Sequence, residues 1–142
     1  MTKKFVITGP ESSGKTTLAK GLSKSLDCEL VVEYAREYLM ELEGSYTFND
    51  VEVMARKQLE LEKKLQGEVA VLDTDLSVYA IWIKEKYGKE IDWINQSISH
   101  EKNKIYFLCE ILYNWEDDPL REHPSIEDRQ RLFRAYEVLL QK

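Results

Sequence analysis

The chain has few of the residues that build disulfide scaffolds or metal clusters. Its 142 residues include two cysteines, two histidines and three prolines. Cys28 and Cys109 are far apart and form no C-x-x-C motif, and His100 and His123 lack the spacing of metal ligands. The sequence therefore predicts neither a disulfide framework nor a histidine metal site. Free thiols are typical of the reducing cytoplasm, so we expect a cytoplasmic protein.

Long hydrophobic runs and an excess of positive charge are also missing. No apolar run approaches the roughly 18 residues that a membrane-spanning helix needs. The first residues lack the apolar segment of a signal peptide. The formal net charge is −6, whereas domains that bind duplex nucleic acid are usually basic. We therefore expect neither a membrane nor a nucleic-acid partner, and any phosphate site must be built from local groups.

The residues that are present predict a globular α/β fold. Hydrophobic residues make up 43% of the chain, which is ordinary for a packed domain. Short apolar runs alternate with helical patterns, which predicts βα units and a parallel sheet. The expected strands span residues 4–8, 29–33, 68–73 and 104–110. The expected helices span residues 15–26, 34–43, 49–66, 77–87, 92–102 and 126–142, the third starting with a capping box of Asn49 and Glu52.

The most informative stretch is GPESSGKTT, residues 9–17, directly after the first expected strand. Its spacing, Gly-x-x-x-x-Gly-Lys-Thr, is the P-loop pattern. Backbone N–H groups in such a loop, at a helix N-terminus, form a nest for nucleotide phosphates. We expect Lys15 to reach the β- and γ-phosphates of ATP and Thr16 to hold Mg²⁺. The expected phosphate-binding residues are Gly9, Glu11, Ser12, Ser13, Gly14, Lys15, Thr16 and Thr17.

The motif and the order of elements together predict a P-loop NTPase fold of the nucleoside- and nucleotide-kinase type. Its three α/β/α layers would surround a parallel sheet of four strands, with the P-loop strand between those ending at Asp73 and near Glu110. Kinase sheets of this type usually have five strands. We therefore expect one domain over residues 1–142, incomplete at its C-terminus. The edge beyond the fourth strand would then be bare or covered by a neighbouring chain.

Carboxylates follow two of the expected strands. Asp73 ends the apolar run VAVLD, where a carboxylate at the carboxyl edge of the sheet can bind Mg²⁺. Asp75 is the better candidate for capping the next helix, and we also include it among the expected substrate contacts. Glu33 follows the second strand and is expected to hold or deprotonate an attacking hydroxyl. Arg36, on the next helical turn, is a further expected substrate contact.

A polar, proline-containing stretch at about residues 112–129 is expected to form a lid. Its Arg121 and Arg129 would reach the transferring phosphoryl group when the lid closes, and we include both among the catalytic residues. Trp82 and Trp115 are the candidates for stacking on the ring of a substrate. For Trp82, packing in the core is an equally good interpretation, because it shares a helical stripe with Val78 and Ile81.

Several of these segments, taken together, resemble a known family. FVITGPESSGKTTLAKGLS, VVEYAREYL and VLDTD, with Trp82 and the lid residues Trp115, Asp118, Arg121 and Arg129, resemble the nicotinamide riboside kinase domain of bacterial NAD-biosynthesis regulator proteins. Such domains are grouped with AAA-type ATPases. The resemblance covers nearly all of the chain, although Leu112 and Asn114 replace an Asp and a Pro of the family's lid.

The resemblance implies ATP- and Mg²⁺-dependent phosphorylation of the 5′-hydroxyl of nicotinamide riboside, which gives nicotinamide mononucleotide in NAD salvage. Two alternatives stay open from the residues themselves. One is a kinase for another nucleoside, nucleotide or small molecule, because tryptophan stacking does not distinguish flat bases. The other is a regulatory ATPase switch without an acceptor, which would need neither Glu33 nor the lid arginines.

Overall fold

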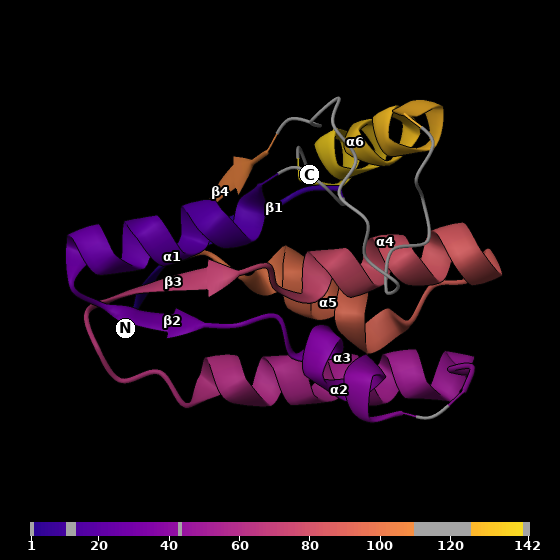
Figure 1. The fold of residues 1–142 in the computed structure, drawn as a ribbon, viewed down its shortest axis with the longest axis horizontal. Coiled ribbons are helices and arrows are strands. Elements are labelled where there is room, and N and C mark those ends of the chain that lie inside the picture. The colour runs from indigo at the N-terminus through magenta and orange to yellow at the C-terminus, as the bar shows by residue number, and fades with distance from the viewer. Residues whose placement is uncertain (1, 11–13, 43, 110–125, 141–142) are drawn as a thin grey trace.

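A parallel sheet organises the protein in the computed structural model (Figure 1), which describes residues 2–10, 14–42, 44–109 and 126–140, apart from the side chains of Ile126 and Arg129. The strands are β1 (Lys3–Thr8), β2 (Glu29–Val31), β3 (Val69–Asp73) and β4 (Lys104–Leu108). The helices are α1 (Lys15–Leu26), α2 (Tyr34–Glu41), α3 (Phe48–Lys63), α4 (Leu76–Tyr87), α5 (Asp92–His100) and α6 (Ile126–Leu140).

The strand order is β2-β3-β1-β4, and every neighbouring pair is parallel. Val6 of β1 lies opposite Leu72 of β3 and Tyr106 of β4. The predicted α/β class and four parallel strands are confirmed within the described residues, as is the place of the P-loop strand between β3 and β4. Because parallel strands end at the same edge, the segments after β1, β2 and β3 meet there.

The two faces of the sheet pack against different helices, as expected for successive side chains of a strand. Ile7 and Val71 point to the face that α1 covers with Ala19. Val6 and Leu72 point to the opposite face, where the C-terminal part of α3 packs with Leu61. All but Leu61 are almost fully buried. This double coverage produces the predicted α/β/α layers.

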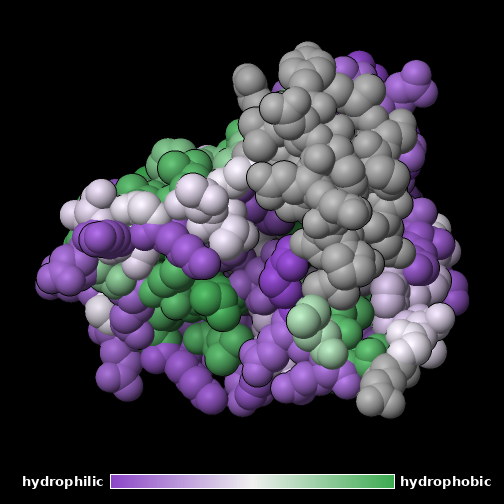
Figure 2. All heavy atoms as spheres, in the orientation of Figure 1, coloured by the Kyte–Doolittle hydropathy of each residue, from purple (hydrophilic) through white to green (hydrophobic). Residues whose placement is uncertain are grey.

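A second apolar cluster joins α2, α3, α4 and α5, which Figure 1 shows grouped beyond the carboxyl ends of β2 and β3. It is centred on Met54 and Tyr79, both fully buried. Helix α6 packs separately, through Leu132 and Tyr136, against Ile81 of α4. Figure 2 shows that hydrophilic residues cover much of the visible face, with a hydrophobic area below α1.

Several predicted boundaries were wrong. Helix α3 starts with a capping box of Thr47 and Asp50 rather than of Asn49 and Glu52. It ends at Lys63 instead of residue 66. Beyond this end, the backbone N–H groups of Gln66 and Gly67 donate to the Glu29 carboxylate rather than to helical carbonyls. Strand β2 stops at Val31, so residue 33 lies in the connection to α2.

Candidate active site

Two glycines set the path of the phosphate loop from β1 into α1. Gly9 has a φ of +141°, and a Cβ there would lie 2.9 Å from the carbonyl oxygen of Cys109. Gly14 is the N-cap of α1 with a φ of 77°. Both conformations favour glycine. Gly14 offers no side chain to cap α1, so the start of this helix suits an anion. Glu11, Ser12 and Ser13 lie outside the described residues.

Thr16 and Asp73 meet at the carboxyl edge of the sheet, as predicted. The Thr16 hydroxyl donates a hydrogen bond of 2.8 Å to Oδ2 of Asp73. The other oxygen, Oδ1, is buried and has no hydrogen-bond partner within the described part of the chain. Burial raises the pKa of Asp73, as does the nearby Glu33 charge, while the Thr16 hydrogen bond and the charges of Lys15 and Lys20 oppose the rise.

An unpaired buried carboxylate oxygen beside a threonine hydroxyl fits a hard divalent cation. Magnesium prefers oxygen ligands and is usually held by one or two protein groups together with substrate phosphates. No group of three or more His, Cys, Asp or Glu side chains suited to a metal occurs among residues 2–10, 14–42, 44–109 and 126–140. The Thr16–Asp73 pair therefore matches a cation that also binds nucleotide, rather than an all-protein metal cage.

Lys15 and Glu33 form the second pair of this site. Their charged atoms lie 3.8 Å apart, and both side chains are mostly buried. Glu33 is the N-cap residue of α2, but its carboxylate makes no capping hydrogen bond. The carboxylate is therefore directed to the P-loop lysine rather than to its own helix. We call Lys15, Thr16, Glu33 and Asp73 the phosphate cluster.

Asp75 occupies a different environment, although it is only two residues from Asp73. It is the N-cap of α4, and its Oδ1 accepts hydrogen bonds from the Ser77 backbone N–H and hydroxyl. Its Oδ2 accepts from Lys104 at 2.8 Å and from the Tyr106 hydroxyl at 2.7 Å. The capping role is confirmed. Asp75 is 1% exposed and has a protein donor on each oxygen, so this structure offers no support for the predicted substrate contact.

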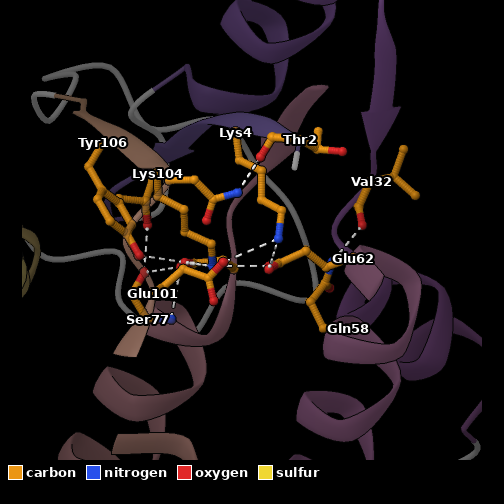
Figure 3. Close-up of polar contacts among 12 residues, drawn as sticks. Thr2, Lys4, Val32, Gln58, Glu62, Ser77, Glu101, Lys104 and Tyr106 are labelled. Atoms are coloured by element: carbon orange, nitrogen blue, oxygen red, sulfur yellow. Dashed lines mark hydrogen bonds and ion pairs between the residues drawn. The ribbon is translucent and has the colours of Figure 1, made fainter. Parts of the chain in front are cut away.

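Asp75 belongs to a larger set of paired side chains beside the sheet. We call it the buried polar network: Lys4, Glu62, Asp75, Glu101, Lys104 and Tyr106. Figure 3 shows Lys4 and Lys104 converging on Glu62. Lys4 lies 2.9 Å from Glu62 and 3.2 Å from Glu101, and Lys104 lies 3.1 Å from Glu62. No sequence pattern predicts this network, because Lys4, Glu62 and Asp75 are far in the chain from the segment that holds Glu101, Lys104 and Tyr106.

The turn between Asp73 and Asp75 separates the two environments. Thr74 has a φ of 67°, which a threonine rarely adopts. Its N–H donates to the Ile7 carbonyl at 2.8 Å. Its hydroxyl lies 3.1 Å from that of Thr8. Sequence reasoning missed Thr74, and the only available signal was a polar residue between two aspartates at a strand end.

The predicted substrate contacts on helices have mixed outcomes. Trp82 is partly buried, lies over Tyr79 with ring centroids 6.1 Å apart, and donates its indole N–H to the Tyr46 hydroxyl. The packing interpretation is therefore confirmed, and stacking on a ligand stays a prediction. Arg36 lies exposed on the first turn of α2.

The predicted lid falls almost entirely outside the described residues. Trp115 and Arg121 belong to residues 110–125, and Arg129 is described only by its backbone, within α6. Their roles stay predictions. Over the described parts of the chain, no helix has both the length and the hydrophobicity needed to cross a membrane.

Comparisons with known proteins agree with this geometry. The model of a family described as AAA domain matches residues 4–142. The trifunctional NAD biosynthesis/regulator protein NadR of Salmonella typhimurium (strain LT2) is 28% identical over 131 residues, which are 87% of this chain and 32% of that protein. The NadR of Escherichia coli (strain K12) gives the same values. The chain thus spans about a third of the length of the curated relatives it matches.

Solved structures show the same fold. A crystal structure of a NadR protein in complex with NR aligns with a TM-score of 0.79 and 22% identity, covering 99% of this chain and 42% of that chain. A NadR protein in complex with NAD and AMP-PNP aligns with a TM-score of 0.71 and 21% identity, covering 99% and 40%. The resemblance to NAD-biosynthesis regulator proteins is confirmed, and the chain belongs to the AAA domain family of P-loop proteins.

Proposed function

We propose that the chain is a kinase that transfers the γ-phosphoryl group of ATP to the 5′-hydroxyl of nicotinamide riboside. The observation that carries the proposal is the phosphate cluster. The P-loop Lys15 lies 3.8 Å from Glu33, beside the buried Asp73 carboxylate, whose Oδ1 has no hydrogen-bond partner in the part of the chain that the structure describes. A site that only bound nucleotide would need the lysine and the cation ligands, but it would have no use for Glu33.

Each residue of the phosphate cluster has a separate role in the proposed reaction. The start of α1 and Lys15 bind the phosphates of ATP and stabilise the charge that develops on them. Thr16 and Asp73 would hold Mg²⁺, which would supply positive charge to neutralise the phosphates. Glu33 accepts the proton of the acceptor hydroxyl, whose oxygen attacks the γ-phosphorus while ADP leaves. Arg121 and Arg129 are proposed to reach the transferring group from the lid.

The choice of acceptor rests on the relatives. One similar structure is that of a NadR protein with NR, and another is that of a NadR protein with NAD and AMP-PNP. We propose that Arg36, Trp82 and Trp115 border the acceptor site, with the two tryptophans beside the nicotinamide ring. The predicted contact of Asp75 is not carried into this proposal, because both of its oxygens already accept hydrogen bonds from the protein. The free thiols of Cys28 and Cys109 are consistent with work in the cytoplasm.

The experiment is an ATP–Mg²⁺ incubation with nicotinamide riboside and a panel of other nucleosides, read by mass spectrometry. We expect nicotinamide riboside to gain one phosphate group and ATP to be converted to ADP in equal amount. Phosphorylation of a different nucleoside only would keep the kinase and overturn the acceptor. ATP hydrolysis with no phosphorylated nucleoside would overturn the proposal in favour of an ATPase switch.

A further inference from the structure

Helix α3 has a buried glutamine on the face that it turns to the interior. Its neighbours on this face, Val51, Met54 and Ala55, are all fully buried. Gln58 is 2% exposed, although a primary amide is costly to remove from water without hydrogen bonds. A polar residue in an otherwise apolar stripe calls for specific partners, and none of the steps described above uses it.

Both ends of the Gln58 amide bind the short connection between β2 and α2. Its Nε2 donates to the Val32 carbonyl at 3.0 Å, which Figure 3 shows. Its Oε1 accepts from the Tyr34 backbone N–H at 2.8 Å and from the Tyr79 hydroxyl at 3.2 Å. A carbonyl needs a donor and an N–H needs an acceptor, so the two backbone partners fix the orientation of the amide.

The residue between these two backbone partners is Glu33. One amide therefore holds the peptide groups on both sides of the residue whose carboxylate faces Lys15. Gln58 also supplies an acceptor at the start of α2. The first N–H groups of a helix have no partner within the helix, and the Tyr34 N–H, the first of them in α2, is bound by Gln58. The Glu33 carboxylate makes no capping hydrogen bond to α2 and lies 3.8 Å from Lys15.

We propose that Gln58 is a positioning residue that holds Glu33 in place for phosphoryl transfer. The inference rests on the proposed function, because it gives Glu33 a catalytic task. Gln58 itself touches neither Lys15 nor Asp73 through any hydrogen bond found in the described residues. It acts through the backbone on both sides of Glu33, where its amide binds the Val32 carbonyl and the Tyr34 N–H.

The test is a double-mutant cycle between Gln58→Met and Glu33→Gln. Methionine has a similar shape and removes all three hydrogen bonds. We expect Gln58→Met to lower kcat for transfer to nicotinamide riboside by about 10- to 100-fold, the size of effect that small misplacements of a catalytic group produce. The KM for ATP should stay near that of the wild type. If Gln58 acts through Glu33, the double variant should be no slower than Glu33→Gln alone.

Two controls separate positioning from loss of stability. Val51→Ala also weakens the buried face of α3 but keeps every Gln58 hydrogen bond, so transfer should stay close to that of the wild type. Tyr79→Phe removes only the bond that does not reach the Val32–Tyr34 connection, so it should also stay close. Amide hydrogen exchange gives a readout without substrate. The Tyr34 N–H should exchange faster in Gln58→Met and not in Val51→Ala.

The outcomes are distinct. If the wild type transfers no phosphoryl group, the proposed function fails and the inference falls with it. If the wild type transfers and Gln58→Met matches it, or the effects of Gln58→Met and Glu33→Gln simply multiply, only the inference is overturned. Should Gln58→Met fail to fold, Gln58→Asn replaces it, since its shorter amide cannot span both backbone partners. An unchanged kcat in Gln58→Asn would then overturn the inference.

Discussion

Asp73 and Asp75 are separated by one residue and both are buried, yet their pKa values shift in opposite directions. The pKa of Asp73 is raised, mainly by burial and by the charge of Glu33. Burial also opposes ionisation of Asp75, but the charge and hydrogen bond of Lys104, together with hydrogen bonds from Ser77 and Tyr106, hold its pKa below the usual value. Both Asp75 oxygens have partners within the chain, whereas Oδ1 of Asp73 has none among the described residues.

The same difference separates the two polar regions to which these residues belong. Ion pairs of the buried polar network span 2.8–3.2 Å. In the phosphate cluster the Lys15–Glu33 pair spans 3.8 Å. A buried polar group without a partner is costly, so natural folds retain one chiefly where a ligand completes it. The comparison indicates that the network stabilises the fold and that the phosphate cluster is built for ligands.

The largest expected effect is a loss of phosphoryl transfer when Glu33 of the phosphate cluster is changed. Glu33→Gln keeps the shape of the side chain and removes its charge. If Glu33 accepts the proton of the acceptor, transfer should fall by about 10²–10⁴-fold while ATP affinity stays nearly constant. Steady-state kinetics with separate nucleotide binding measurements checks this. Glu37→Gln, on the exposed first turn of α2, is the matched control, and an equal loss of transfer and ATP binding in Glu33→Gln would mean a role in the fold.

In the buried polar network, we expect a substitution to cause a comparably large loss of stability. Lys104→Met leaves the buried Asp75 and Glu62 without their shared cation, and removing one partner of a buried pair costs about 3–5 kcal/mol of unfolding free energy. Urea unfolding measures it. The same substitution at Lys64, whose pair with Glu60 is exposed, should change stability by less than about 1 kcal/mol. Equal small changes in both variants would show that the network contributes little to the fold.

Lys15→Ala tests the phosphate cluster with a smaller expected loss. Turnover of ATP should fall by about 10²–10³-fold, the effect of removing one preorganised group that stabilises transition-state charge. The fold should survive, because Lys15 is not one of the buried core residues. Lys24→Ala, at the other end of α1, is the control in the same assay. A near-normal turnover in Lys15→Ala would refute the P-loop assignment.

The smallest expected effect is a decrease in stability at alkaline pH, caused by groups of the buried polar network. The pKa of Tyr106 is raised by burial and by Asp75, and that of Lys104 is raised because Asp75 and Glu62 outweigh its burial. Above about pH 10, an unfolded chain releases protons from these groups that the folded chain keeps. Stability should therefore fall as pH rises through this range. Tyr106→Phe should reduce the slope of unfolding free energy against pH, and an unchanged slope would contradict the assignment.

The sequence predicted the parts of the site that depend on local chemistry. Gly14 and Lys15 follow a recognisable spacing, and the carboxylates of Glu33 and Asp73 follow apolar runs that became neighbouring strands. The predicted start of α3 was wrong for a physical reason. Thr47–Asp50 and Asn49–Glu52 are overlapping capping signals two residues apart. In the fold Asp50 also accepts a hydrogen bond from the Tyr38 hydroxyl and Glu52 accepts one from Trp93, contacts that a local pattern does not contain.

The sequence pattern does not predict which side chains pair across long distances in the chain. In β4 the polar Lys104 and Tyr106 point inward to Asp75, while Ile105 and Phe107 are exposed at 41% and 42%. Alternating residues usually indicate apolar side chains facing the interior and polar ones facing solvent, and in β4 the order is reversed. Lys104 and Tyr106 face inward because Glu62 of α3 and Asp75 at the start of α4 pair with them, and Tyr106 also packs against Val6 of β1. The predicted lid at residues 112–129 stays a prediction, since only α6 of that region is described.

A structure of the protein with Mg²⁺ and a non-hydrolysable ATP analogue tests the central claim most directly. The account predicts a cation beside Thr16 and Asp73, reached directly or through water, with Lys15 turned from Glu33 to the phosphates. Asp75 should keep its hydrogen bonds to Lys104, Ser77 and Tyr106. A cation bound elsewhere with Asp73 turned away, or a buried polar network that opens to bind the nucleotide, would contradict it.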